Sequence, residues 1–102
     1  MIKLALFARF EAKPGKEDDV AAFLQTGLQL ANEEAGTPIW FALRLSHSVF
    51  GVFDAFHDEA GREAHLTGEI AKALMANAEA LFVTPPVIDR LDVLCLKNDG
   101  SV

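Results

Sequence analysis

One histidine in this chain stands in a setting where its side chain could do chemistry. His65 shares a helical stripe with Gly61, Ala64 and Gly68, at the i, i+3, i+4 and i+7 spacing of one helix face. Because such small residues let a helix lie close to a sheet, we expect the imidazole to point into a cavity beneath the helix. There it could act as a general base on a phenolic or anthrone proton. The alternative is a packed histidine bonded to a backbone carbonyl.

Aromatic side chains are the candidates for binding a flat ligand. Trp40, Phe56 and Phe82, together with Phe50 and Phe53, could form a lining that stacks on an aromatic ring. Aromatic residues at strand spacing are commonly part of the hydrophobic core, so the alternative for each of these five is a core position. Trp40 and Phe56 are the stronger candidates for a pocket.

Two arginines lie within apolar strands, where a guanidinium needs a partner or an exit to water. Arg9 and Arg44 could therefore hold an oxygen anion in the pocket. The alternative is a salt bridge to Asp54 or Glu11 across neighbouring strands.

Neither a metal site nor a cofactor is predicted. The three histidines, His47, His57 and His65, lack the i, i+4 or short-loop spacing of a metal site. The sequence contains no glycine-rich phosphate loop and no nucleophile elbow. Any reaction is therefore expected to proceed without a cofactor.

Charge and composition narrow the class of partner and the compartment. A net charge of −6 repels phosphate backbones, so nucleic acid is not expected as a ligand. No apolar run approaches the roughly 20 residues of a membrane span. Cys95 is the single cysteine, which excludes an intramolecular disulfide and is typical of an intracellular protein; we expect it to pack as a small hydrophobic residue in a strand. These features predict a cytoplasmic location.

Hydropathy patterns predict the elements that must position these residues. Alternating apolar residues predict strands over 3–11, 37–46, 48–56 and 87–97, the middle two forming a hairpin. Helical spacing predicts one helix from Glu17 to Gly36 and a second helical stretch that begins after Asp58 as N-cap. The apolar stripe rotates after Gly68, which predicts a break there.

The predicted order is βαββαβ, in one α+β domain over residues 1–97 with a loose tail at 98–102. This split βαβ order packs helices on one face of an antiparallel sheet. The strands are apolar on both alternating faces, however, as in the run from Leu4 to Ala8. A second copy of the sheet would cover the other face, so a homodimer is expected.

Three segments resemble the antibiotic biosynthesis monooxygenase superfamily: FARFEAKPGKEDDVAAFL near the start, FDAFHDEAGREAHLTGEIAKAL in the middle and TPPVIDRLDVL near the end. The most specific piece is Phe56 at the end of the third strand, followed by 58–60 (DEA) and 64–66 (AHL). The resemblance runs from Met1 to about Lys97 and implies a ferredoxin-like subunit, a dimeric α+β barrel and a pocket between sheet and helices. Close relatives often carry Trp where this chain has Phe56.

Two function classes follow. The resemblance implies a cofactor-independent monooxygenase that uses dioxygen on small aromatic or quinol substrates, with His65 as base and Trp40 and Phe56 as packing surface. The alternative is a non-catalytic dimeric module that binds a small ligand or a partner in the same pocket. Haem degradation, also found in the superfamily, is disfavoured because the first strand lacks the Asn that the haem degraders share.

Overall fold

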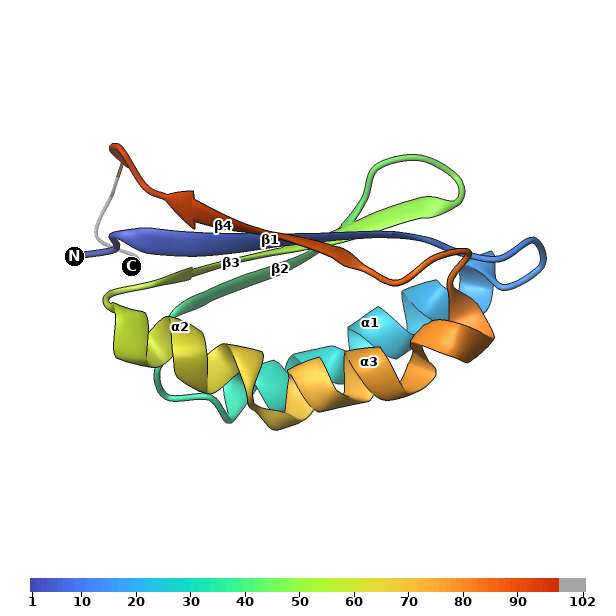
Figure 1. The fold of residues 1–102 in the computed structure, drawn as a ribbon, viewed down its shortest axis with the longest axis horizontal. Coiled ribbons are helices and arrows are strands. Elements are labelled where there is room, and N and C mark those ends of the chain that lie inside the picture. Colours follow the sequence, from blue (N-terminus) through green and yellow to red (C-terminus); the bar gives the residue numbers. More distant parts are fainter. Residues whose placement is uncertain (98–102) are drawn as a thin grey trace.

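A four-stranded antiparallel sheet carries three helices on one face (Figure 1), in a computed structural model that describes residues 1–97. The strands are β1 (Leu4–Glu11), β2 (Ile39–Arg44), β3 (Val49–Phe56) and β4 (Val87–Asp92), and the helices are α1 (Glu17–Asn32), α2 (Glu59–Leu66) and α3 (Glu69–Leu81). The strand order within the sheet is β2-β3-β1-β4. The predicted α+β class and ferredoxin-like order are confirmed. The predicted tail at 98–102 lies outside the described residues.

The fourth strand is shorter than predicted. It ends at Asp92, which pairs with Leu4, the first residue of β1, so the ladder stops where its partner strand begins. Residues 93–97 continue without strand structure, and Cys95 is exposed rather than packed in a strand. The predicted hairpin and the break near Gly68 are both found, since α2 ends at Leu66 and α3 begins at Glu69.

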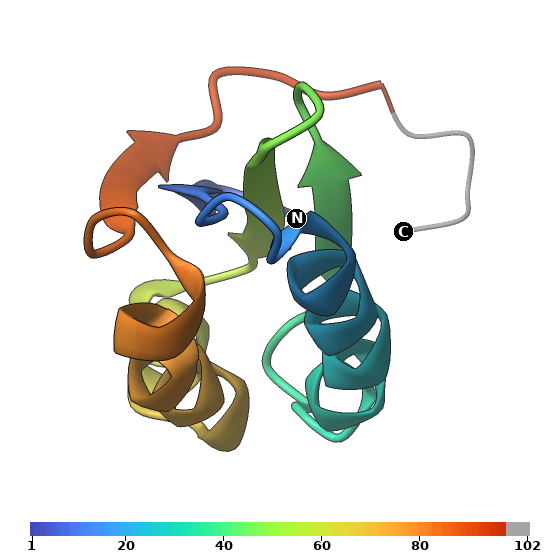
Figure 2. The same cartoon turned by 90° about the vertical axis from the view of Figure 1, so that its right-hand side faces the viewer.

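The core lies between the sheet and the helices. Even-numbered side chains of β1 and β3, among them Phe10 and Val52, face the helix layer and pack against Val20 and Leu24 of α1. Phe82, just after α3, stacks on Phe10 with ring centroids 4.5 Å apart. α1 and α3 run side by side beneath the sheet (Figure 2).

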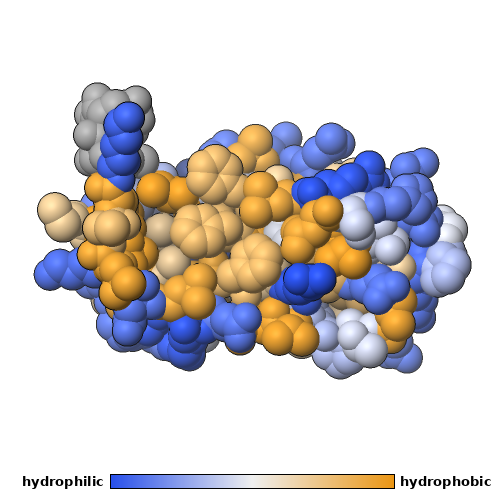
Figure 3. Space-filling view, turned by 90° about the horizontal axis from the view of Figure 1, so that it is seen from above, coloured by the Kyte–Doolittle hydropathy of each residue, from blue (hydrophilic) through white to orange (hydrophobic). Residues whose placement is uncertain are grey.

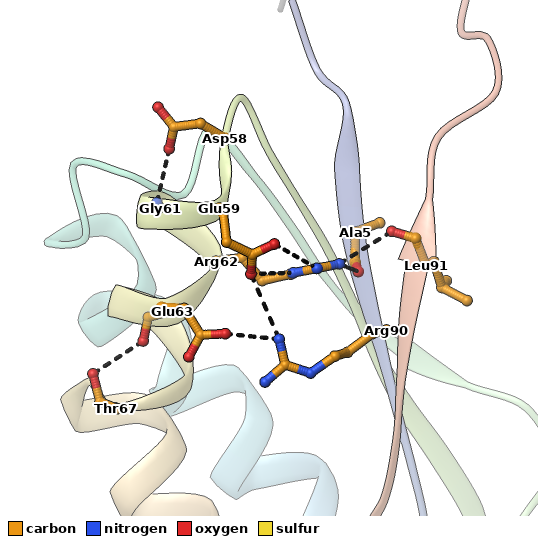
Figure 4. A network of polar contacts seen from close by, with 9 residues as sticks. All are labelled: Ala5, Asp58, Glu59, Gly61, Arg62, Glu63, Thr67, Arg90 and Leu91. Carbon is orange, nitrogen blue, oxygen red and sulfur yellow. Dashed lines mark hydrogen bonds and ion pairs between the residues drawn. The ribbon is translucent and has the colours of Figure 1, made fainter.

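A buried arginine fixes α2 against the sheet (Figure 4). Arg62 Nη1 donates to the carbonyl oxygens of Ala5 in β1 and Leu91 in β4, each at 3.3 Å. The same guanidinium donates to both carboxylate oxygens of Glu59, at 3.2 and 2.9 Å. Asp58 begins the helix as predicted by accepting from the Gly61 amide at 2.8 Å. Since His65 lies one turn beyond Arg62, these contacts also set the position of its imidazole.

The opposite face of the sheet carries apolar side chains (Figure 3). Phe41 is 55% exposed there and lies beside Phe53, with ring centroids 6.5 Å apart. Leu43 and Val87 are also exposed on this face. We call this surface, made of the odd-numbered residues of the strands, the open face.

Candidate functional site

His65 lies between two carboxylates that come from distant parts of the chain. Its Nε2 is 2.8 Å from Oδ2 of Asp54, in β3, and its Nδ1 is 2.5 Å from Oε1 of Glu34, in the loop after α1. His65 is buried, and Asp54 is only 2% exposed. The ring of Phe56 packs against the imidazole with centroids 5.5 Å apart. The alternative of a backbone carbonyl partner is therefore wrong, because both ring nitrogens face carboxylates.

Two glycines of the predicted small-residue stripe let the loop bearing Glu34 approach α2. A Cβ on Gly61 would lie 2.7 Å from the carbonyl oxygen of Gly36, and a Cβ on Gly68 would lie 2.8 Å from Glu34 Oε2. A side chain at Gly61 would meet backbone, and one at Gly68 would displace the Glu34 carboxylate. The Thr37 hydroxyl also donates to Glu34 Oε1 at 3.0 Å, which orients that carboxylate toward His65.

The surroundings of Asp54 and His65 raise the pKa of both groups. Burial raises the pKa of Asp54 above its ordinary value, against the lowering effect of the hydrogen bond and charge of His65. Burial alone would lower the pKa of His65, but the hydrogen bonds and charges of Asp54 and Glu34 together outweigh it and raise that pKa. Each ring nitrogen faces a carboxylate oxygen, and an imidazolium can donate to both at once. Moving one proton from Nε2 to Asp54 Oδ2 gives a neutral pair with the same total number of protons.

A cavity of about 50 Å³ adjoins this trio. Asp54 and His65 form the polar part of its wall, and the rest is apolar. The lining residues from the strands are Leu6, Ala8, Trp40, Val52, Asp54 and Ile88, and those from the helices are Phe23, Leu24, His65, Leu66, Ile70, Ala71 and Leu74. A benzene ring occupies a cavity of roughly 150 Å³ in an engineered protein, so an aromatic ligand requires the lining to move outward.

Three buried polar atoms at the site have no partner among the described residues: Asp54 Oδ1, Trp40 Nε1 and Glu34 Oε2. Trp40 and Asp54 are directly opposite each other on β2 and β3, and both line the cavity. Buried polar atoms nearly always have a hydrogen-bond partner. A donor and an acceptor are thus left for a ligand or a water molecule.

The structure brings together some of the predicted pocket residues. His65 and Trp40 line the cavity. Phe56 is fully buried and packs against the His65 ring, but it does not line the cavity. Phe82 is part of the core, stacked on Phe10, and does not reach the cavity.

Neither predicted arginine lines the cavity. The guanidinium of Arg44 lies 4.7 Å from the ring centroid of Phe50, at the edge of the sheet. Arg9 is exposed on the open face, because its neighbour Ala8 points into the cavity and side chains alternate along a strand. The alternative of a salt bridge to Asp54 is wrong as well, since the partner of that carboxylate is His65.

Sequence reasoning missed the roles of Asp54 and Glu34. Asp54 is the single acid at an inward position of β3, between Val52 and Phe56, and that pattern could have suggested a buried acid. Glu34 had no comparable signal, because it lies in a loop whose path depends on Gly36 and Gly61. Residues 1–97 hold no cluster of three or more His, Cys, Asp or Glu suited to a metal ion. In the same range, no helix combines the length and apolarity needed to cross a membrane.

Among solved structures, one similar protein also shares more than half of its residues with this chain. NE2512 from Nitrosomonas europaea, a protein of unknown function, shares 58% identity at a TM-score of 0.94, over 98% of this chain and 97% of that one. The chain belongs to the family of that protein. Neither a protein-family model nor a curated protein matches this chain.

More distant structures share the fold. PA3566 from Pseudomonas aeruginosa is 25% identical, with a TM-score of 0.78 over 93% of this chain and 97% of that one. A candidate antibiotic biosynthesis monooxygenase from Caulobacter crescentus is 18% identical, with a TM-score of 0.77 over 91% of each chain. The resemblance to the antibiotic biosynthesis monooxygenase superfamily is thereby confirmed at the level of fold.

The raised pKa values of His65 and Asp54 predict that the stability of the fold depends on pH. A group whose pKa is raised by folding stabilises the fold fully below its unfolded pKa, and that contribution is lost as pH rises through the folded pKa. For His65 the loss begins above about pH 6.5, and the raised pKa of Asp54 acts in the same direction. We expect the urea midpoint to fall as the pH rises above about 6.5 in the wild type and to stay flatter in His65→Gln. Parallel pH profiles for the two proteins would contradict this account.

Proposed function

We propose that the cavity binds a small hydroxylated aromatic molecule and that the trio of Asp54, His65 and Glu34 removes its proton, which opens the molecule to dioxygen. The observation that carries the proposal is the unpartnered Asp54 Oδ1 beside the cavity, in a carboxylate whose other oxygen contacts a histidine. The fold shared with a candidate monooxygenase also supports a reaction with dioxygen.

In this proposal, Asp54 meets the substrate and His65 positions it. Carboxylates engage both ring nitrogens of His65, so the imidazole has no nitrogen free to accept a proton from a ligand. The raised pKa of Asp54 makes that carboxylate a stronger base than an exposed one. Glu34 holds Nδ1 and so fixes the ring in the orientation that serves Asp54.

For an anthrone bound as its enol tautomer, Asp54 takes the hydroxyl proton, and the resulting anion transfers one electron to dioxygen. The two radicals combine at the ring carbon opposite the hydroxyl into a carbon-bound peroxide, which takes the proton back from Asp54. Loss of water from that hydroperoxide leaves a ketone, so the CH₂ of the anthrone and O₂ become C=O and H₂O. Dioxygen is the oxidant, and the electrons come from the substrate.

The cavity has a route to expansion. The α-carbons of α3 all lie more than 8 Å from those of the strands, and α3 packs on α1 and α2. Its side chains Ile70, Ala71 and Leu74 form the wall opposite the sheet. An outward shift of this helix would enlarge the cavity without breaking a strand pair.

Oxygen uptake in the presence of hydroxylated aromatics tests the proposal. Purified protein should consume dioxygen with at least one quinol or anthrone, and Asp54→Asn should lower the rate at least tenfold, because the proton acceptor is lost. Asp18→Asn, the same change at an exposed position of α1, is the matched control and should leave the rate unchanged. Tight binding with no oxygen uptake in any case would favour the non-catalytic module instead.

We also propose that the open face packs against a second copy of the chain to form a homodimer. The support is the pair Phe41 and Phe53 at the centre of an apolar sheet face that no helix covers. Contiguous exposed apolar surface of this kind usually marks an association site.

A further inference from the structure

We infer that the ligand is held through a hydroxyl group that accepts from Trp40 Nε1 and donates to Asp54 Oδ1, so the site selects neutral phenols and enols over carboxylates and amines. The inference rests on the proposed function in placing the ligand in this cavity, and it adds which chemical group is recognised.

The two unpartnered atoms are complementary. Trp40 Nε1 can only donate, and an ionised Asp54 Oδ1 can only accept. The residues are direct cross-strand partners on the helix-facing side of the sheet, where opposite Cβ atoms lie about 4.5 to 5.5 Å apart. Asp54 is 2% exposed, so bulk water does not compete freely for it. One oxygen atom bearing one proton satisfies both atoms at once.

Other ligand groups leave one atom unpaired or meet the wrong charge. An ammonium group would pair with Asp54 but present only donors to the indole N–H. A carbonyl or ether oxygen would accept from Trp40 and leave Asp54 Oδ1 without a donor. A carboxylate would place a third carboxyl group beside those of Asp54 and Glu34, and like charges repel. A hydroxyl avoids all three penalties. Water can also accept from Trp40 and donate to Asp54, so it competes with the ligand for this position.

The size of the cavity agrees with recognition of a small polar group. Its volume of about 50 Å³ suits a hydroxyl group and the ring edge that bears it. The remaining wall is apolar, with Leu6 and Val52 from the sheet and Leu74 from α3, which suits the carbon skeleton of a phenol.

The single tryptophan of the chain is in this site, so its fluorescence reports binding directly. We would titrate the wild type with phenol, anisole, benzoate and benzylamine. Phenol should bind at least tenfold more tightly than each of the others, because only phenol both accepts and donates. Equal affinity for phenol and anisole, tighter binding of benzoate or benzylamine, or no binding of phenol would overturn the inference.

A variant separates this inference from the proposed function. By calorimetry, Trp40→Phe should weaken phenol binding about tenfold, because the aromatic ring remains while the donor is lost. The same variant should raise KM for the quinol or anthrone in the oxygen-uptake assay. If KM is unchanged, the inference falls and the oxygenase proposal stands. If wild-type protein prefers phenol as stated but consumes no oxygen with any quinol, the oxygenase proposal falls and the recognition of a hydroxyl stands.

Discussion

Replacing Arg62 with alanine is expected to lower the free energy of unfolding by about 3 kcal/mol. The side chain is only 8% exposed and donates to two backbone carbonyls, of Ala5 and Leu91, as well as to Glu59. Hydrogen bonds from a charged group contribute about 1.5 to 3 kcal/mol each, and the buried aliphatic stem adds packing. Urea denaturation at neutral pH measures the change.

The matched control is Arg90→Ala in the same network. Arg90 contacts Glu63 at 2.7 Å and Glu59 at 3.5 Å, but its side chain is 53% exposed. Solvent screens such pairs, so the loss should be much smaller than that of Arg62→Ala. Similar losses in the two variants would show that burial of Arg62 adds nothing, against the view that it anchors α2 to the sheet.

Replacing Phe41 with aspartate is expected to convert the proposed dimer into monomers. The side chain is 55% exposed and stacks on Phe53 in the open face. A charge buried at the centre of an apolar interface without a partner is strongly unfavourable. Sedimentation velocity at micromolar protein should show a dimer for the wild type and a monomer for the variant.

Leu28→Asp is the control for this second prediction. Leu28 is 46% exposed on α1, on the helix side of the molecule, and the same apolar-to-acidic change there should leave the dimer intact. A monomeric wild type, or a Phe41→Asp variant that remains dimeric, would refute the open face as the interface.

The two proposals are connected through the sheet. Phe53 faces outward and Asp54 faces the cavity, because adjacent residues of β3 point to opposite faces. A partner subunit on the open face would therefore hold β3 rigid directly behind the carboxylate that meets the substrate. Loss of the dimer is expected to reduce oxygen uptake as well, and the assay of Phe41→Asp would show it.

The sequence by itself determined the order of the elements and pointed to His65 as the histidine to examine. The hairpin, the Asp58 cap and the break near Gly68 follow from patterns within about ten residues, where local preferences decide the structure. Two-sided apolar strands likewise predicted an open face on the side away from the helices.

Only the tertiary structure decided which groups surround His65. Asp54 and Glu34 reach it because a strand, a loop and a helix come together there. The close contact between Gly61 of α2 and Gly36 lets the loop that bears Glu34 approach the helix. Strand register decided that Arg9 points away from the cavity, since a shift of one residue exchanges the two faces. The last strand ends at Asp92 because its partner begins at Leu4, a limit set by pairing between distant segments and not by the apolar run itself.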